Sequence, residues 1–240
     1  MTKLNLGNFK PLSSTVPSRM IVRSWGPEKS GKNHFGLTAA GPIFGLYFDP
    51  GGLEGMAEKF LVEPLGPKEI NKIEYRFNKK TNSQEEAIAV KEQWLADYED
   101  ALNVAKTVQI DETELWELCR FAEWGRESAK GREYGPLNGE YRGLIRDAYD
   151  AGVNLHMIQK IKEKWVNDKP SGEYFGMGFQ QAGNIAQVNI EHSWSLDEGF
   201  KVKIHNCRQN MSLAGQEYPE LTWAELGMLV FPETDEGSWV

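Results

Sequence analysis

The sequence predicts an α/β fold, in which a mostly parallel sheet is flanked by helices. The first observation behind this prediction is that short apolar segments of strand length alternate with helical segments from residue 20 to residue 160. The second is that two later strand-like segments, 186–194 and 200–206, are joined by the turn sequence SLDEG. We expect this pair to form an antiparallel hairpin that extends the sheet.

The expected elements begin with an apolar strand and continue in alternation. Buried strands are expected at 20–25, 43–48, 107–111 and 153–159, and an alternating strand at 72–77. Helices are expected at 32–40, 53–60, 83–105, 112–125 and 222–230. The third of these helices starts at Ser83 and has Glu86 three residues later, which is the signature of a capping box.

A chain of 240 residues, 40% of them hydrophobic, is long enough for one domain with a substantial core. We expect that domain to span 20–232, with an irregular leader at 1–19, a small insertion at 64–82 and an acidic tail at 233–240. The net charge is -8, and Arg208 is the last basic residue. The acidic end is interpreted either as a solvated end or as a segment that competes with nucleic acid for a basic groove.

The composition also indicates a compartment. Cys119 and Cys207 form no C-x-x-C pair, which is typical of proteins in a reducing compartment. No apolar run approaches the roughly 18 residues of a membrane span, and the first residues lack the apolar core of a secretion signal. The sequence therefore predicts a cytoplasmic protein without a membrane partner.

The strongest functional signal is a glycine-containing segment that joins an apolar strand to a helix. It reads Gly26-Pro27-Glu28-Lys29-Ser30-Gly31-Lys32, followed by Asn33 and His34. The pattern matches the phosphate-binding loop G-x-x-x-x-G-K-[ST] up to its last position. In such a loop the glycines permit close approach, backbone N–H groups and the helix N-terminus attract phosphates, and the lysine binds the β- and γ-phosphates. We expect residues 26–34 to bind a nucleotide.

The last position of the motif departs from the pattern. Asn33 stands where a serine or threonine hydroxyl usually contacts Mg²⁺. An amide oxygen is also a hard, neutral ligand and reaches one atom further. The substitution either keeps the Mg²⁺ contact, shifts it, or replaces it with a water bridge. We expect nucleotide binding to persist, whereas the effect on hydrolysis stays open.

Acidic residues near strand ends are expected to complete the site. Asp111 ends an apolar strand and is expected to hold a magnesium-bound water; the alternative is that it only caps the following helix. Glu112 and Glu54 are the main candidates for orienting an attacking water. Glu114 is either a further candidate or a surface residue, and Asp49 lies at a strand tip within possible reach. The residues alone do not decide among them.

A family resemblance rests on these segments. The loop GPEKSGKNH resembles the Walker A loop of RecA recombinases. The order of GLYFDPGGLEG, TVQIDETELWELCRFAEWGR, YGPLNGEYRGLIRDAYDAGVNLHMIQKIKEKW and NCRQN resembles a family of bacteriophage AAA-type nucleotide-binding proteins, over about residues 20–232. The resemblance implies a RecA-like P-loop ATPase domain that binds ATP and Mg²⁺. Some family members act in single-strand annealing or recombination beside a phage single-strand-binding protein.

The resemblance also implies roles for single residues. Lys32 would be the lysine of the loop, and Asp111 the Walker B acid. Gln159 would lie near the sensor of the γ-phosphate, although from the residues alone it is equally an edge residue. The following segment, 160–183, would be a mobile DNA-binding loop. Gly51 stands where RecA has its catalytic glutamate, so hydrolysis would be slow or would use Glu54 or Glu112.

Two segments carry basic residues that are candidates for contact with single-stranded DNA, a role that the resemblance favours. In the first, lysines would follow phosphates while aromatic side chains stack on bases. The alternative is that neighbouring acidic residues cancel this charge and that the aromatic residues belong to the core. The candidates are Lys162, Lys164 and Trp165 in the first segment, and Arg126, Lys130 and Arg132 in the second.

RecA-like ATPases often complete their site with a basic finger from a neighbouring subunit, so the resemblance also implies a ring or filament of identical subunits. The candidates for the finger are Lys201, Lys203 and Arg208, and the alternative is an exposed strand face with alternating lysines. The leading hypothesis is a phage-type ATPase that acts on single-stranded DNA in the cytoplasm of an infected bacterium. The alternative is a non-hydrolysing, nucleotide-switched interaction module for a phage replication or packaging partner. A phage nucleotide kinase ranks lower, since no Arg-rich lid is evident.

Overall fold

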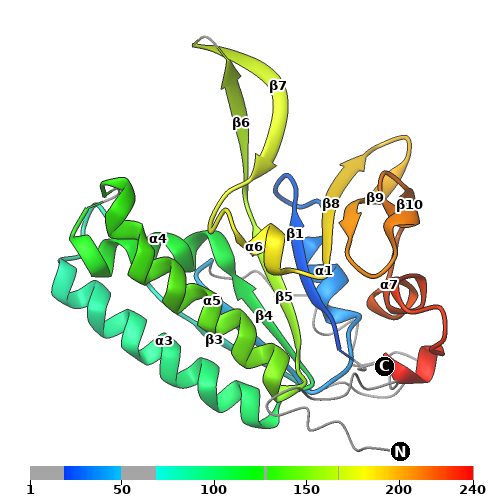
Figure 1. Cartoon of the computed structure of the whole chain (residues 1–240), viewed down its shortest axis with the longest axis horizontal. Helices are drawn as coiled ribbons and strands as arrows, with labels where there is room; N and C mark the ends of the chain where they lie inside the picture. Colours follow the sequence, from blue (N-terminus) through cyan, green and yellow to red (C-terminus); the bar gives the residue numbers. More distant parts are fainter. Residues whose placement is uncertain (1–18, 50–68, 127–128, 167, 240) are drawn as a thin grey trace, which may run out of the picture.

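The computed structural model describes residues 19–49, 69–126, 129–166 and 168–239. In this part of the chain, eight strands form one sheet in the order β10-β9-β8-β1-β5-β4-β2-β3 (Figure 1). The strands are β1 (Ile21–Trp25), β2 (Ile43–Tyr47), β3 (Ile70–Glu74), β4 (Thr107–Asp111), β5 (Asn154–Gln159), β8 (Val188–Ser195), β9 (Gly199–Cys207) and β10 (Glu217–Pro219). Pairing is parallel from β8 to β3 and antiparallel for β9 and β10. This confirms the predicted α/β class, its mostly parallel sheet and its antiparallel extension.

Helices cover both faces of this sheet (Figure 1). One face packs against α3 (Gln84–Val104), α4 (Glu112–Trp124) and α5 (Tyr134–Ala151), whose apolar side chains share a core with β4 and β5. The other face packs against α1 (Lys32–Leu37) and α7 (Trp223–Val230), whose apolar side chains share a core with β1, β8 and β9. No helix in the described ranges is both long and apolar enough to cross a membrane.

The predicted capping box of α3 is confirmed. Ser83 Oγ accepts a hydrogen bond from the Glu86 N–H at 3.2 Å, and Glu86 Oε2 accepts one from the Ser83 N–H at 2.7 Å. Helix α5 is not among the expected elements, because its first turn contains glycine and proline. Pro136 is tolerated there because the first N–H groups of a helix have no intrahelical acceptor. Four to five turns later the helix ends at Gly152, whose φ is 74°.

Two expectations about surface segments need correction. The strand expected inside a small insertion is β3, which pairs in parallel with β2 and forms the edge of the main sheet. The acidic end is more than a solvated end, because Trp239 is fully buried. Its ring stacks on Phe231, and its Nε1–H donates to Thr234 Oγ1 at 2.8 Å. This contact, with the short helix η3 (Glu236–Ser238), attaches the segment to α7.

Within the segment 160–183, which was expected to be a mobile loop, two strands pair as a β-hairpin. Its strands, β6 (Ile161–Val166) and β7 (Lys169–Gly176), form a separate antiparallel pair. The hairpin projects from the sheet directly after β5, and the short helix α6 (Ala182–Ile185) follows it (Figure 1). Its residues are almost all exposed, so cross-strand pairing holds the hairpin rather than a core of its own.

Candidate phosphate-binding site

The glycine loop lies between β1 and α1, as the motif predicts, and β8 borders it. Parallel pairing sets Trp25 of β1 beside Glu191 of β8, one residue before the loop begins. A Cβ added at Gly26 would lie 2.2 Å from the His192 carbonyl oxygen, so this position has no room for a side chain. Gly31 has a φ of 89°, which other residues rarely adopt. The two glycines of the motif are therefore required by backbone contact and by conformation.

This contact gives a testable expectation for stability. Gly26→Ala is expected to lower the free energy of unfolding by about 1–3 kcal/mol, the usual cost of overpacking, because the loop or β8 must move. The matched control is Gly139→Ala in the middle of α5, where a Cβ would meet nothing within 4 Å. That change is expected to be neutral or stabilising, since alanine is the better helix former. Urea unfolding of both variants checks the pair, and equal stabilities would contradict the assigned contact.

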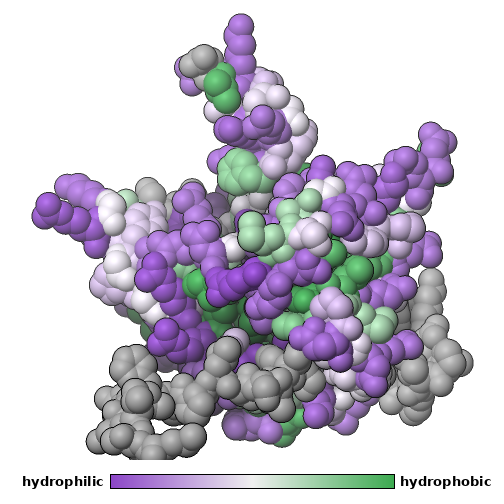
Figure 2. All heavy atoms as spheres, turned by 45° about the vertical axis from the view of Figure 1, so that its right-hand side comes forward, coloured by the Kyte–Doolittle hydropathy of each residue, from purple (hydrophilic) through white to green (hydrophobic). Residues whose placement is uncertain are grey.

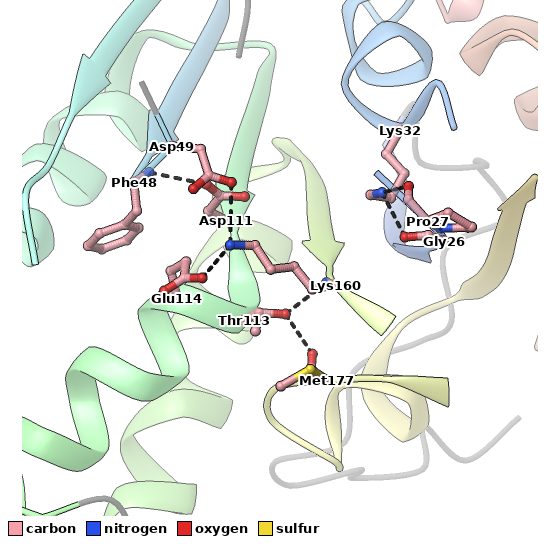
Figure 3. A network of polar contacts seen from close by, with 10 residues as sticks. All are labelled: Gly26, Pro27, Lys32, Phe48, Asp49, Asp111, Thr113, Glu114, Lys160 and Met177. Atoms are coloured by element: carbon pink, nitrogen blue, oxygen red, sulfur yellow. Dashed lines mark hydrogen bonds and ion pairs between the residues drawn. The ribbon is translucent and has the colours of Figure 1, made fainter. Parts of the chain in front are cut away.

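Lys32 folds back over the loop. Its Nζ donates to the Gly26 carbonyl at 2.8 Å and to the Pro27 carbonyl at 2.6 Å (Figure 3). Burial lowers the pKa of Lys32 to about 8, while the charges of Asp111 and Glu28 act in the opposite direction. The carbonyls are neutral acceptors, so a phosphate would compete well for the ammonium group. With only six residues, α1 has a weak helix dipole, so Lys32 and the loop backbone would be the main ligands of an anion bound here.

Two buried histidines lie beneath the loop. His156 Nε2 lies 2.6 Å from Ser24 Oγ, and the rings of His156 and His192 both contact Phe35 of α1. Burial lowers the pKa of His156 to about 3 and that of His192 well below its ordinary value. Both side chains are therefore neutral at pH 7 and contribute no charge to the loop.

A cluster of carboxylates faces the loop. Asp111 ends β4, Asp49 follows β2, and Glu114 lies in the first turn of α4 (Figure 3). Burial raises the pKa of Asp111 to about 6, and its Oδ2 accepts a hydrogen bond from the Phe48 N–H at 3.1 Å. Asp111 occupies the N-cap position of α4 but makes no side-chain cap bond, so capping does not explain it.

Lys160 is the cation in the middle of this cluster. Its Nζ forms ion pairs with Glu114 and, at 3.4 Å, with Asp49. Its backbone N–H donates to Thr113 Oγ1 at 2.9 Å, and that hydroxyl donates to the Met177 carbonyl at 2.9 Å (Figure 3). Lys160 begins the segment 160–183, which was expected to bind DNA, and sequence reasoning gave it no role at this edge. Its role depends on β5 lying beside β4, which no local pattern encodes.

The order of the strands explains why these groups meet. Strands β1, β5, β4 and β2 are neighbours and parallel, so their carboxyl ends lie along one edge of the sheet. Ligand sites of open α/β sheets lie at this edge. The loop is at one side and the carboxylates are at the other, with the end of β5 between them (Figure 3). Lys32 and Asp111 are close enough for the charge of Asp111 to affect the pKa of the lysine.

Glu112 follows Asp111 directly, but its side chain turns into the protein and away from the carboxylate cluster. Its side chain is fully buried and accepts a hydrogen bond from the Phe179 N–H at 2.6 Å and another from the Gln159 amide. Gln159 Oε1 in turn accepts from Arg23 Nε at 2.8 Å. Burial raises the pKa of Glu112 to about 8, which Arg23 opposes. This position argues against a water-activating base and for a role in holding the base of the hairpin.

Gln159 belongs to the same buried group. It is the last residue of β5, which lies between β1 and β4, so Gln159 does not belong to an edge strand of the sheet. Its side chain is fully buried and turned towards Arg23 and Glu112. A sensor role would therefore operate through this network, by movement of the strand end. Arg23 was not among the expected site residues, and a lone arginine in a strand carries no sequence signal of its own.

The expected DNA-binding residues lie in two separate places. Lys162, Lys164 and Trp165 are exposed on β6. Arg126, Lys130 and Arg132 lie in the connection between α4 and α5, at the far end of α4 from the sheet edge. With 13 residues in α4, that end is about 20 Å from the helix start. The two groups therefore do not form one continuous basic surface next to the loop.

The expected finger residues all have partners within their own chain. Lys201 pairs with Glu198 at 2.7 Å, and Lys203 pairs with Glu217 at 3.4 Å. Arg208 donates to the Asn184 carbonyl. These intrachain contacts would have to break before any of the three residues could reach the site of a neighbouring subunit. The remaining candidate, Glu54, and the departure at Gly51 lie outside the described residues.

The oxygen-bearing side chains of the site are of the type that binds Mg²⁺, although few of them could contact the ion. Among the described residues, no group of three His, Cys, Asp or Glu side chains is arranged to hold a metal ion. Mg²⁺ commonly takes one or two carboxylates, with phosphate oxygens and waters completing six ligands. Asp111 offers a carboxylate at the sheet edge, and Asn33 offers an amide oxygen at the start of α1.

Comparisons with known proteins give no family assignment. A scan of the chain against protein-family models found no match, and a search of curated proteins also found none. The resemblance to phage nucleotide-binding proteins therefore stays a prediction from the quoted segments. The geometry of the loop and of the carboxylates has to support any function by itself.

Proposed function

We propose that the chain is a RecA-like P-loop ATPase that binds ATP with Mg²⁺ and acts on single-stranded DNA. The observation that carries the proposal is the pairing of a glycine loop, with Lys32 over it, and the carboxylate Asp111 on the same sheet edge. A triphosphate in the loop would extend its terminal phosphate towards Asp111. Bound Mg²⁺ would neutralise phosphate charge there, with Asp111 and Asn33 as its protein contacts.

The hairpin β6–β7 is the proposed contact with DNA. Its exposed aromatic side chains include Trp165, Tyr174 and Phe175, at 60%, 53% and 43% exposure. Lys162 pairs across the strands with Phe175, so a cation and an aromatic ring share one face of the hairpin. This combination suits a single strand, because lysines contact phosphates and rings stack on bases. The hairpin begins directly after Lys160, and the Met177 carbonyl that follows it accepts a hydrogen bond from Thr113 Oγ1, so both ends of the hairpin lie beside the carboxylates of the site.

The test is fluorescence anisotropy of a labelled single-stranded oligonucleotide, titrated with the protein with and without ATP and Mg²⁺. Tighter binding with ATP supports the proposal, of which a ring or filament of identical subunits, beside a phage single-strand-binding protein, is a further part that this assay does not test. Binding in neither state removes the DNA role and leaves the nucleotide site to be tested separately.

Within this assay, Trp165→Ala is expected to weaken DNA binding by roughly 5- to 100-fold, the usual contribution of one stacked base. The double variant Lys162→Ala with Lys164→Ala is expected to reduce the salt slope by about 1.4, or 0.7 for each phosphate contact. Exposed Met211 on another surface supplies the control, Met211→Ala, which is expected to bind normally. An unchanged affinity and salt slope in both hairpin variants would show that the hairpin is not the contact.

A second function is favoured by the carboxylates. Glu112 is buried and hydrogen-bonded, and Glu114 is paired with Lys160, so neither is free to activate water. Asn33 also departs from the usual hydroxyl. These features favour a module that binds ATP without hydrolysis and switches its contact with a replication or packaging partner. A phosphate-release assay separates the two functions: no turnover in the wild-type protein, together with measurable ATP binding, supports the module.

A further inference from the structure

The strands β8 and β9 carry an apolar row that is only partly covered. On one face, Ile190 pairs with Ile204, His192 with Val202, and Trp194 with Phe200. The first two pairs are buried, and they share a core with Phe35 of α1 and Trp223 of α7. The third pair, called the aromatic pair below, continues this row beyond the helices. Trp194 is 52% exposed and Phe200 is 41% exposed.

The aromatic pair lies directly beside the phosphate loop. A Cβ at Gly31 would be 3.1 Å from Cδ1 of Phe200, so the ring rests against the loop at the residue before Lys32. The two rings are tilted by 48°, with centroids 6.4 Å apart, and both retain exposed surface. Figure 2 shows hydrophobic surface among polar residues on the side of the molecule that carries β8 and β9.

The position of the pair relative to the carboxylates matters. In the sheet, β8 and β9 lie on one side of β1, whereas β5, β4 and β2 lie on the other. The loop is thus bordered by aromatic rings on one side and by Asp111 on the other. A nucleotide has the same polarity, with an aromatic base at one end and the terminal phosphate at the other. Phosphates over the loop, with the terminal one towards Asp111, would direct the base towards the rings.

We infer that Trp194 and Phe200 form the base-binding subsite for the nucleotide whose phosphates occupy the loop. This inference rests on the proposed function, and it specifies which part of the ligand these residues recognise. Stacking uses the π-face that every base offers, so the subsite is expected to bind adenine and guanine nucleotides with similar affinity. It also gives the aromatic pair a reason to remain exposed in the free protein.

The test compares Mg·ATP with inorganic tripolyphosphate, which has the phosphates but no base. Dissociation constants are measured by calorimetry for the wild-type protein and for Phe200→Ala, Phe200→Leu, Phe200→Tyr and Trp194→Ala. We expect the wild type to bind ATP more tightly than tripolyphosphate. The two Phe200 variants without a ring and Trp194→Ala are expected to lose roughly 5- to 100-fold in ATP affinity, with tripolyphosphate affinity unchanged. Phe200→Tyr is expected to bind like the wild type, and Met211→Ala is the exposed hydrophobic control.

The two ligands distinguish failure of this inference from failure of the proposed function. Equal affinities for ATP and tripolyphosphate in the wild type would overturn the subsite while leaving the phosphate loop in place. An equal loss for both ligands in Phe200→Leu would also overturn it, because Phe200 would then act only by packing on Gly31. If no variant loses affinity for either ligand, the subsite is overturned, and the exposed aromatic pair is better explained as a contact for a protein partner. Absence of binding for both ligands in the wild type would overturn the proposed function itself.

Discussion

Lys32→Ala is expected to weaken Mg·ATP binding by roughly 100-fold or more. Each charge-assisted hydrogen bond to a phosphate contributes about 1.5–3 kcal/mol, and about 1.4 kcal/mol corresponds to a factor of ten. Lys32 Nζ already donates to two acceptors, the carbonyls of Gly26 and Pro27. Two phosphate oxygens could take the place of these carbonyls as acceptors. Calorimetry with ATP and with tripolyphosphate should show the same loss, because the lysine contacts phosphate and not the base.

The control for this variant is Lys106→Ala. Lys106 is exposed, precedes β4 and lies at the opposite edge of the sheet from the loop. Its replacement is expected to leave nucleotide binding unchanged. A melting temperature within a few degrees of the wild type, together with lost binding, assigns the effect to the site. Unchanged binding in Lys32→Ala would remove the phosphate role of the loop.

The protonation of Lys32 gives a second check on the same residue. Its pKa of about 8 in the folded protein lies below the ordinary value of 10.5. In the free protein the charge is therefore present below pH 8 and is lost as the pH rises through that value. Nucleotide affinity in the wild type is expected to fall above about pH 8. Lys32→Arg keeps its charge throughout this range and is expected to show a flatter profile.

Local patterns predicted the strands, the loop and α3, because each depends on neighbouring residues. The apolar run 20–25 and the glycines after it specify a strand and a turn without reference to the rest of the chain. The parallel sheet then follows from the alternation of strands and helices. The hairpin β6–β7 was missed because its exposed strands have no apolar alternation, so only their pairing defines them.

The site residues likewise fall into those that local patterns predicted and those that only the strand order brings together. Asp111 was predicted because it ends an apolar strand, and it does lie at the sheet edge. Glu112, the next residue, begins α4 and points into the protein, so adjacency in sequence does not give a shared location. Lys160 and Phe200 reach the site only because β5 and β9 lie where they do in the sheet. Such contacts depend on strand order, which residue spacing does not report.

Glu112→Ala is expected to lower the free energy of unfolding by about 3 kcal/mol or more. The change leaves the Phe179 N–H and the Gln159 amide without their acceptor, and each unsatisfied buried donor costs about 1–3 kcal/mol. The effect should be strongest at the base of the hairpin, since Phe179 lies where the chain returns from β7 to α6. Hydrogen exchange of the Phe179 amide should therefore accelerate more than exchange in α3.

The milder variant Glu112→Gln tests the charge of this residue. Burial raises the pKa of Glu112 to about 8 from an ordinary value of 4.5. Between these two values the folded protein holds a proton that the unfolded chain has released, so this residue makes stability fall as the pH rises. Glutamine cannot titrate, so the variant should lack that part of the slope. Asp111, with its pKa raised to about 6, contributes a slope of the same sign, but that slope is common to both proteins.

Urea unfolding at pH 5 and pH 8 measures this difference. The free energy of unfolding of Glu112→Gln minus that of the wild type should be larger at pH 8 than at pH 5. The control for the substitution itself is Glu92→Gln, which replaces an exposed carboxylate in the middle of α3. Parallel profiles for Glu112→Gln and the wild type would show that the buried carboxyl is ionised throughout, held by Arg23. Full stability in Glu112→Ala would instead contradict its role in holding the hairpin to the sheet edge, because a dispensable acceptor cannot connect the two.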